Sequence, residues 1–294
     1  MRLLRYLLVS CSAAAMAGAV TFTGATAAPA AAPARSHTVP SARFLAEARA
    51  VLAGYLRHNH PQAVPVGPGR VLGAGGTTAI SLANWAGYAD VSTTNQEFTR
   101  VSGSWTTPSV TCSAEDQVTS DWVGLDGLTD LTAEQLGTIS WCYEGKPVYL
   151  TWYEMYPNPN GATQVGVTVQ PGDKITASVT RSGTKYTLKL TDATNTANSF
   201  TTTATCALTT CKDTTAEWIS ERPTFSIGVV PQAHYNAFKI TNGTETAGGT
   251  SGTIGSFATN EAITMVDATG AYALGTVSPL TGGNSFSTTW KNSY

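Results

Sequence analysis

Three segments of the chain combine tryptophan with acidic side chains, and they hold the residues that could move protons: residues 121–135, 150–157 and 216–223. In an extended strand alternate residues share a face, so Trp152, Glu154 and Tyr156 point together, as do Trp122 and Asp126. A core face would not carry an unpaired glutamate. Aromatic rings beside carboxylates on one sheet face therefore predict a binding cleft with acid–base chemistry.

The sequence after residue 79 lacks the motifs of other hydrolytic mechanisms. Of the four histidines, only His234 follows residue 79, and no serine stands in a G-x-S-x-G motif. There is no HExxH, P-loop or dinucleotide-binding motif, and no CxxC with enough histidine for zinc. We expect no metal and no cofactor, and a reaction that depends on carboxylates, amides and water.

The elements that must position these groups are predicted to be strands. The chain has 42% hydrophobic but only 12% charged residues and is rich in glycine, threonine and serine. Residues 164–206 alternate with period two in short runs separated by turn sequences, which predicts a β-meander. No helical periodicity appears after residue 80. We predict an all-β fold: one antiparallel two-sheet β-sandwich, jelly-roll-like, over residues 80–294.

The front of the chain is typical of an export and processing region. Residues 1–27 have the layout of a signal peptide, with Arg2 and Arg5 before an apolar run and a small-residue cleavage site. A membrane anchor, or a lipoprotein signal at Cys11, is the weaker reading of this segment. Residues 28–79 contain linkers and an apolar-striped helix that Ser41 can cap, which predicts a prosegment over a site. The alternative is a helix that merely decorates the fold.

Charge divides the chain at the same boundary. Residues 1–79 carry seven basic residues and one acid, net +6, whereas the rest carries 10 basic residues and 18 acids, net −8. An acidic body does not suit nucleic acid. The opposite charges suggest that the leader docks on the body near neutral pH and loosens in acid.

Cysteine usage fits an extracellular protein. Apart from Cys11 there are four cysteines, so two disulfides are expected, with three possible connectivities. Cys206 and Cys211 bracket a short turn and favour pairing with each other, which leaves Cys112 with Cys142.

Several short motifs, in order and spacing, resemble the glutamic peptidases, also called eqolisins or peptidase family G1. The resemblance runs from about residue 80 to the end. The motifs are Asn84-Trp85-Ala86-Gly87-Tyr88, Trp122-Val123-Gly124-Leu125-Asp126-Gly127, Gln135-x-Gly137, Trp152-Tyr153-Glu154-x-Tyr156-Pro157 and Ala216-Glu217-Trp218-Ile219-x-Glu221.

The resemblance implies a secreted, acid-acting endopeptidase on a two-sheet β-sandwich, made as a pre-pro-protein, with a metal-free Gln–Glu dyad. By position the dyad is Gln135 and Glu217; Glu221 on the same strand face is the rival of Glu217. The chain departs from the family pattern at Ile139 and Leu150, where fungal members have aspartate. The expected cleft residues are Trp85, Trp122, Trp152 and Tyr156, with Asp126 and Glu154 supporting the dyad or contacting substrate.

We expect activity in acid, near the pKa of an ordinary glutamate, on polypeptide substrates. The expected protein is extracellular, monomeric and without stable membrane association. Two other functions fit parts of the pattern. A jelly-roll glycosidase could use Glu154 and Glu217 as paired carboxylates. A non-catalytic carbohydrate-binding sandwich could use the aromatic residues to stack sugars.

Overall fold

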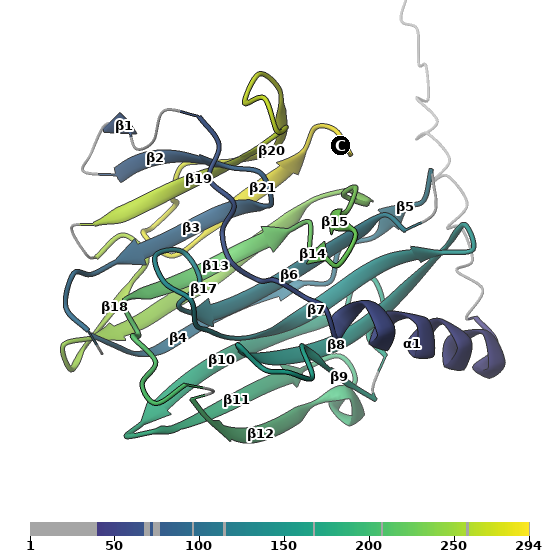
Figure 1. Ribbon diagram of the computed structural model, residues 1–294, viewed down its shortest axis with the longest axis horizontal. Helices are drawn as coiled ribbons and strands as arrows, with labels where there is room; N and C mark the ends of the chain where they lie inside the picture. Colours follow the sequence, from purple (N-terminus) through teal and green to yellow (C-terminus); the bar gives the residue numbers. More distant parts are fainter. Residues whose placement is uncertain are drawn as a thin grey trace, which may run out of the picture. The chain divides into compact units, whose positions relative to one another are not determined.

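A computed structural model describes residues 40–293, apart from residues 68–70, 73–76, 96, 114–115, 167, 207 and 257–258. The predicted signal peptide, residues 1–27, lies outside the described residues. In the described part, a single α-helix, α1 (Ala42–Leu56), precedes a body of β-strands (Figure 1). Ser41 caps this helix, as predicted, because its hydroxyl accepts the N–H of Phe44 at 3.2 Å.

The strands form two sheets that share β17 (Phe238–Ala247). In spatial order the first sheet contains β9 (Thr163–Val165), β8 (Lys146–Tyr156), β7 (Ala133–Tyr143), β6 (Val118–Leu125), β13 (Thr215–Glu221), β3 (Trp85–Val91) and β19 (Asn260–Val266). At its far edge lie β2 (Thr77–Leu82) with β1 (Val71–Leu72), and β20 (Ala273–Val277) with β21 (Phe286–Trp290).

The second sheet contains β12 (Phe200–Thr205), β11 (Lys185–Asp192), β10 (Lys174–Ser182), β4 (Phe98–Thr106), β17 and β18 (Thr250–Thr253). Short pairs join β14 (Thr224–Phe225) to β15 (Gly228–Val229) and β5 (Val110–Thr111) to β16 (His234–Tyr235), and a 3₁₀ turn spans Thr196–Asn198. The predicted two-sheet β-sandwich is confirmed.

Burial distinguishes the two sheets. In β11 and β12 buried or half-buried residues alternate with exposed ones, since one face of these strands meets the core and the other meets water. By contrast, β6 and β13 are buried at every residue. These strands therefore have a packing partner on each face of the first sheet.

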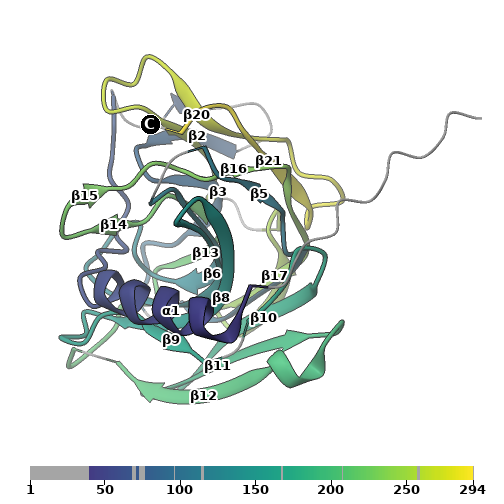
Figure 2. The ribbon, with the colours of Figure 1, turned by 90° about the vertical axis from the view of Figure 1, so that its right-hand side faces the viewer.

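Two apolar clusters account for this double burial. One includes Val123, Leu136 and Trp218 and fills the space between the sheets. The other lies on the opposite face of the first sheet, where Trp85, Trp122 and Trp152 pack with Leu52 and Leu56 of α1. The helix lies beside β8 and β9 in both ribbon views (Figures 1 and 2).

The sequence prediction differs from the structure in two places. The meander includes β10, β11 and β12, but β9 pairs with β8 in the first sheet instead of preceding β10 in the second. Gly166 and Pro171 lie in the irregular stretch between them, and proline cannot donate to a ladder. Among the named strands of the described residues, one pairing, β19 with β2, is parallel and the others are antiparallel.

Both favoured disulfides are present, Cys112–Cys142 and Cys206–Cys211. Among the described residues, no helix has the length and apolar character that crossing a bilayer requires.

Candidate active site

Gln135 and Glu217 lie on opposite sides of one glycine in the first sheet. Gly124 of β6 pairs with Glu217 of β13 on one side and with Gln135 of β7 on the other. Residues paired directly across antiparallel strands share a face, so both side chains project from the same face of the sheet. Two strand spacings, about 10 Å, separate their backbones. Because glycine has no side chain, none projects from the strand between them.

The side chains around Gly124, in the row of paired residues that crosses the sheet here, are closely packed. A Cβ added there would lie 2.9 Å from the Cβ of Gln135 and 3.0 Å from the ring of Trp122. Continuing the same row, Gln135 pairs with Glu154 of β8. Strands β13, β7 and β8 thus place two carboxyl groups and one amide in a single row with Gly124 of β6.

Hydrogen bonds fix one end of each dyad side chain. The Gln135 amide Nε2 donates to Glu154 Oε2 at 3.1 Å, and the Thr215 hydroxyl donates to Glu217 Oε1 at 2.5 Å. The other oxygens, Gln135 Oε1 and Glu217 Oε2, are buried and have no hydrogen-bond partner among the described residues. Each dyad member therefore keeps one polar atom available for a substrate or a water molecule.

Burial dominates the protonation of this face. Desolvation raises the pKa of Glu217 well above its ordinary value; the Thr215 hydrogen bond opposes this, and the charges of Asp126 and Asp130 add to it. Burial likewise raises the pKa of Glu154 to about 8. With the face covered as it is here, burial favours the protonated form of Glu217.

Glu221 shares the face of Glu217 but not its neighbours. It pairs with Ser120 and Trp85, and its Oε2 accepts the indole N–H of Trp122 at 2.8 Å. Glu221 is therefore bound to a tryptophan, on a row apart from Gln135. Burial raises its pKa to about 8.

The predicted aromatic residues do gather on the dyad face. Trp85 and Trp122 are fully buried with ring centroids 5.0 Å apart, and Trp152 is 2% exposed. Tyr156 is half-buried, and its ring lies 6.4 Å from that of His60. The rings are covered because α1 and the chain that follows it pack on this face.

That following chain, residues 57–66, crosses the dyad face and is here named the crossing segment. At its start Asn59 Nδ2 donates to Glu154 Oε2 at 2.7 Å, the same oxygen that holds Gln135. Gly161 allows the close approach, since a Cβ there would lie 2.1 Å from the carbonyl of Leu56. Further contacts are His60 N to Thr224 O (2.9 Å), Ala63 N to Gly127 O (3.0 Å), Ala83 N to Val64 O (2.7 Å) and Val66 N to Ser81 O (3.1 Å).

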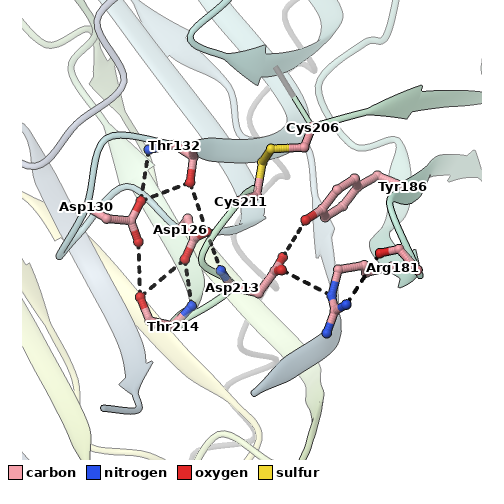
Figure 3. The surroundings of a disulfide bond; sticks show 10 residues. Asp126, Asp130, Thr132, Arg181, Tyr186, Cys206, Cys211, Asp213 and Thr214 are labelled. Carbon is pink, nitrogen blue, oxygen red and sulfur yellow. Dashed lines mark hydrogen bonds and ion pairs between the residues drawn. A yellow bond between two sulfur atoms is a disulfide. The ribbon is translucent and has the colours of Figure 1, made fainter. Parts of the chain in front are cut away.

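Asp126 does not point into the cleft as a substrate contact would. It is fully buried, and its carboxylate accepts the backbone N–H groups of Asp213 at 2.5 Å and Thr214 at 2.7 Å (Figure 3). A third bond, at 3.0 Å, comes from the hydroxyl of Thr132. Asp126 thus joins the loop between β6 and β7 to the start of β13, so it supports the strands that carry the dyad.

Asp126 belongs to a buried acidic cluster with Glu134 and Asp213, whose carboxylate oxygens lie within 4.8 Å of one another. Asp213 also accepts the Tyr186 hydroxyl at 2.8 Å and pairs with Arg181 Nε at 3.1 Å. The Arg181 guanidinium pairs with Asp213, and the backbone amides bind Asp126, so two of the three carboxyl groups have partners. The cluster therefore has a structural role, because it connects separate parts of the chain. Glu134 has no hydrogen-bond partner among the described residues.

This cluster predicts an unusual pH dependence of stability. Burial is the first cause that raises the pKa of Asp126 to about 7 and of Asp213 to about 6, and it raises that of Glu134 well above normal. Carboxyl groups with raised native pKa values contribute full stability below about pH 4 and lose it as pH rises through the native values. We expect the free energy of unfolding to fall between about pH 4 and pH 8.

Urea denaturation of the full chain at several pH values measures this, with Glu217→Gln as background to prevent self-digestion. Adding Glu134→Gln should flatten the decline, whereas adding Glu144→Gln, an exposed turn residue, should not. If the free energy of unfolding rises from pH 4 to pH 7 both with and without Glu134→Gln, the buried acids do not control its pH dependence.

Comparison with known proteins shows the family to which the chain belongs. The sequence model described as the Peptidase A4 family matches residues 83–290, which include the dyad strands. Peptidases of this kind are hydrolases that act on peptide bonds. The chain belongs to the Peptidase A4 family, the eqolisins or glutamic peptidases, which confirms the resemblance found in the sequence.

Individual relatives are consistent with membership of this family. Aspergillopepsin-2 of Aspergillus niger is 30% identical over 218 residues, or 66% of this chain and 75% of the relative. The fold is similar to scytalido-glutamic peptidase with a transition state analog inhibitor (TM-score 0.59, 23% identity, 71% of this chain, 98% of that one). It is also similar to aspergilloglutamic peptidase from Aspergillus niger (TM-score 0.51, 26% identity, 60% of this chain, 99% of that one).

Sequence reasoning missed two residues of the site, Thr215 and Asn59, and it gave Asn84, the first residue of a motif, no role of its own. Thr215 stands two residues before Glu217, so strand parity alone could have placed both on one face. Asn59 has no comparable signal, because it acts across a contact with Glu154, far along the chain.

Proposed function

We propose that this protein is a secreted, acid-acting endopeptidase in which Gln135 and Glu217 activate a water molecule. The observation that carries the proposal is the pairing of both residues with Gly124, which places an amide and a carboxyl group on one sheet face, one on each side of the same glycine. The paired disulfides support secretion, since such bonds persist in oxidising surroundings.

Each dyad member has a role that its chemistry permits. Glu217 as a carboxylate takes a proton from the bound water, which attacks the peptide carbonyl, and then returns the proton to the leaving amine. An amide does not titrate, so Gln135 donates an N–H to the oxygen that becomes negative and helps to hold the water. Glu154 orients Gln135 by accepting its other N–H. No covalent intermediate forms.

Glu217 is preferred to Glu221 because of their neighbours. Glu217 shares the Gly124 row with Gln135, whereas Glu221 pairs with Ser120 and Trp85 and accepts the indole N–H of Trp122. The aromatic residues Trp85, Trp122, Trp152 and Tyr156 would line the substrate cleft once it is uncovered.

Cleavage of denatured casein tests the proposal. The processed protein should cleave at about pH 3 and not at pH 7, in the presence of both a metal chelator and pepstatin. Absence of proteolysis by folded, processed protein would overturn the peptidase mechanism and direct attention to glycan hydrolysis or binding.

We further infer that residues 28–79 act as a prosegment, since α1 and the crossing segment occupy the face that a substrate needs. The covering contacts are apolar packing and hydrogen bonds. Among the described residues no ion pair links α1 to the body, and Arg43 of α1 pairs with Glu47 of the same helix. The net charges suggested that the leader docks by electrostatic attraction. No ion pair between the described leader residues and the body supports this idea.

The Asn59 contact gives a prediction about activation. Full-length Asn59→Ala should become active with a lag several-fold shorter than that of the unaltered chain, because a buried hydrogen bond to a carboxyl group is lost. Progress curves of casein cleavage after a shift to acid measure the lag. Arg43→Gln, which alters only an exposed pair, is the control. Equal lags for both variants would mean that Asn59 does not hold the segment in place.

A further inference from the structure

Asn84, the residue next to β3, binds the backbone of the crossing segment with both ends of its side chain. Its Oδ1 accepts the N–H of Val64 at 2.9 Å, and its Nδ2 donates to the carbonyl of Gln62 at 2.9 Å. Asn84 is fully buried, and these are its side chain's two hydrogen bonds in the described structure. Without residues 62 and 64, both polar atoms would be left unpaired beside the cleft.

The geometry is that of a strand pairing with an extended chain. In an extended peptide the carbonyl of one residue and the N–H of the residue two positions later project from the same edge. Val64 O and Val66 N bond to Ala83 and Ser81 on this edge, and Ala63 N bonds to Gly127 O on the other. The segment is therefore held along both edges, and Figure 1 shows the chain leaving α1 and running across the first sheet toward β2.

All of these hydrogen bonds use main-chain atoms of residues 62–66, so they do not depend on the side chains of the bound segment. The ligand class that fits is an extended polypeptide of any sequence. Residues 62–64 stand three to five positions from Asn59, which contacts Glu154 beside Gln135. At about 3.3 Å per residue, the Asn84 site lies roughly 10–17 Å along the chain from the dyad.

We propose that Asn84, with the edges at Ser81–Ala83 and Gly127, is a main-chain binding subsite for polypeptide substrates, remote from the scissile bond and filled here by residues 62–66. This inference rests on the proposed peptidase function. It explains why the site would favour long polypeptides, because a short peptide held at the dyad does not reach Asn84.

The test uses the crossing segment as a ligand. A recognition sequence for a site-specific protease is inserted within residues 73–76 of the full chain, and the folded protein is cut there so that the segment can exchange. Binding of a fluorescent peptide of residues 57–70 is then measured by anisotropy. A second peptide carries an N-methyl group on the Val64 nitrogen, which removes the N–H that Asn84 accepts.

We expect N-methylation to weaken binding about tenfold in the unaltered protein and to change it little in Asn84→Ala, because a hydrogen bond cannot be lost twice. Asn84→Ala should itself weaken the unmodified peptide about tenfold or more. Asn195→Ala, at the cap of the Thr196–Asn198 turn, should behave as unaltered protein. Equal effects of N-methylation in both proteins would overturn the subsite.

Kinetics separate this inference from the function on which it rests. Asn84→Ala should raise KM for substrates long enough to reach the subsite, with kcat and the KM of short substrates nearly unchanged. Cleavage without this length dependence overturns the subsite and leaves the peptidase standing. Peptide binding that depends on Asn84 in a protein without proteolysis overturns the peptidase instead.

Discussion

Glu217→Gln is expected to lower kcat/KM for a polypeptide by about 10⁴-fold, the largest effect of any single substitution in this protein. The substitution keeps the shape of the side chain and an oxygen that can still accept the Thr215 hydroxyl. It removes the carboxyl group that flanks Gly124 on the side opposite Gln135. Because an amide needs no proton to be buried, the variant should fold at least as well as the unaltered chain.

Initial rates on casein and on a defined peptide measure this effect, with circular dichroism to verify folding. Glu221→Gln is the matched control, since it makes the same change four residues away on the same strand face and should retain activity within about tenfold. If Glu221→Gln lost activity and Glu217→Gln kept it, the assignment of the two glutamates would be reversed.

Gln135→Met is expected to lower kcat by about 10² to 10³-fold while leaving KM within a few-fold, because it removes a donor needed most in the transition state. Methionine has a similar length and no hydrogen-bonding nitrogen or oxygen. Since the amide does not titrate, the pH profile should keep its shape and fall at every pH. Steady-state kinetics from about pH 2 to pH 7 measure both features.

The same experiment discriminates between chemistries. Paired carboxylates, as in a glycosidase, require Glu154 and Glu217 and have no need of an amide between them. A Gln135→Met enzyme with full activity, together with a Glu154→Gln enzyme without any, would favour two carboxylates over the Gln–Glu dyad. Gln135→Glu gives a further check, because a third carboxyl group beside Glu154 should shift the pH profile.

The sequence predicted the sandwich well, because period-two alternation survives in strands such as β11, which have one face in water. It predicted the shared face of Trp152 and Glu154 for the same reason. It predicted a prosegment over a site, but not which contacts hold it there, since periodicity on a helix says that a stripe is buried but not what buries it. For Asp126 it left support and substrate contact open, because the choice depends on Asp213 and Thr214, far along the chain.

The two departures from the family pattern are explained together by the register. Ile139 and Leu150 are direct partners across β7 and β8, and both are buried in the cluster that includes Leu52 and Leu56 of α1. At the two positions where the resemblance led us to expect aspartates, this chain thus has one apolar pair on the covered face. An apolar pair suits burial under a helix, whereas two adjacent carboxyl groups would have to share a proton there.

The buried acids of the sandwich also limit where such an enzyme can work. Asp121, Asp126, Asp213 and Glu134 are all enclosed, and each keeps its proton more firmly in the fold than in the open chain. An enzyme molecule that diffuses from acidic to neutral surroundings therefore loses part of the stability that protects it from digestion. Under the proposed acid-acting function, we therefore expect its range of action to be limited to the acidified zone.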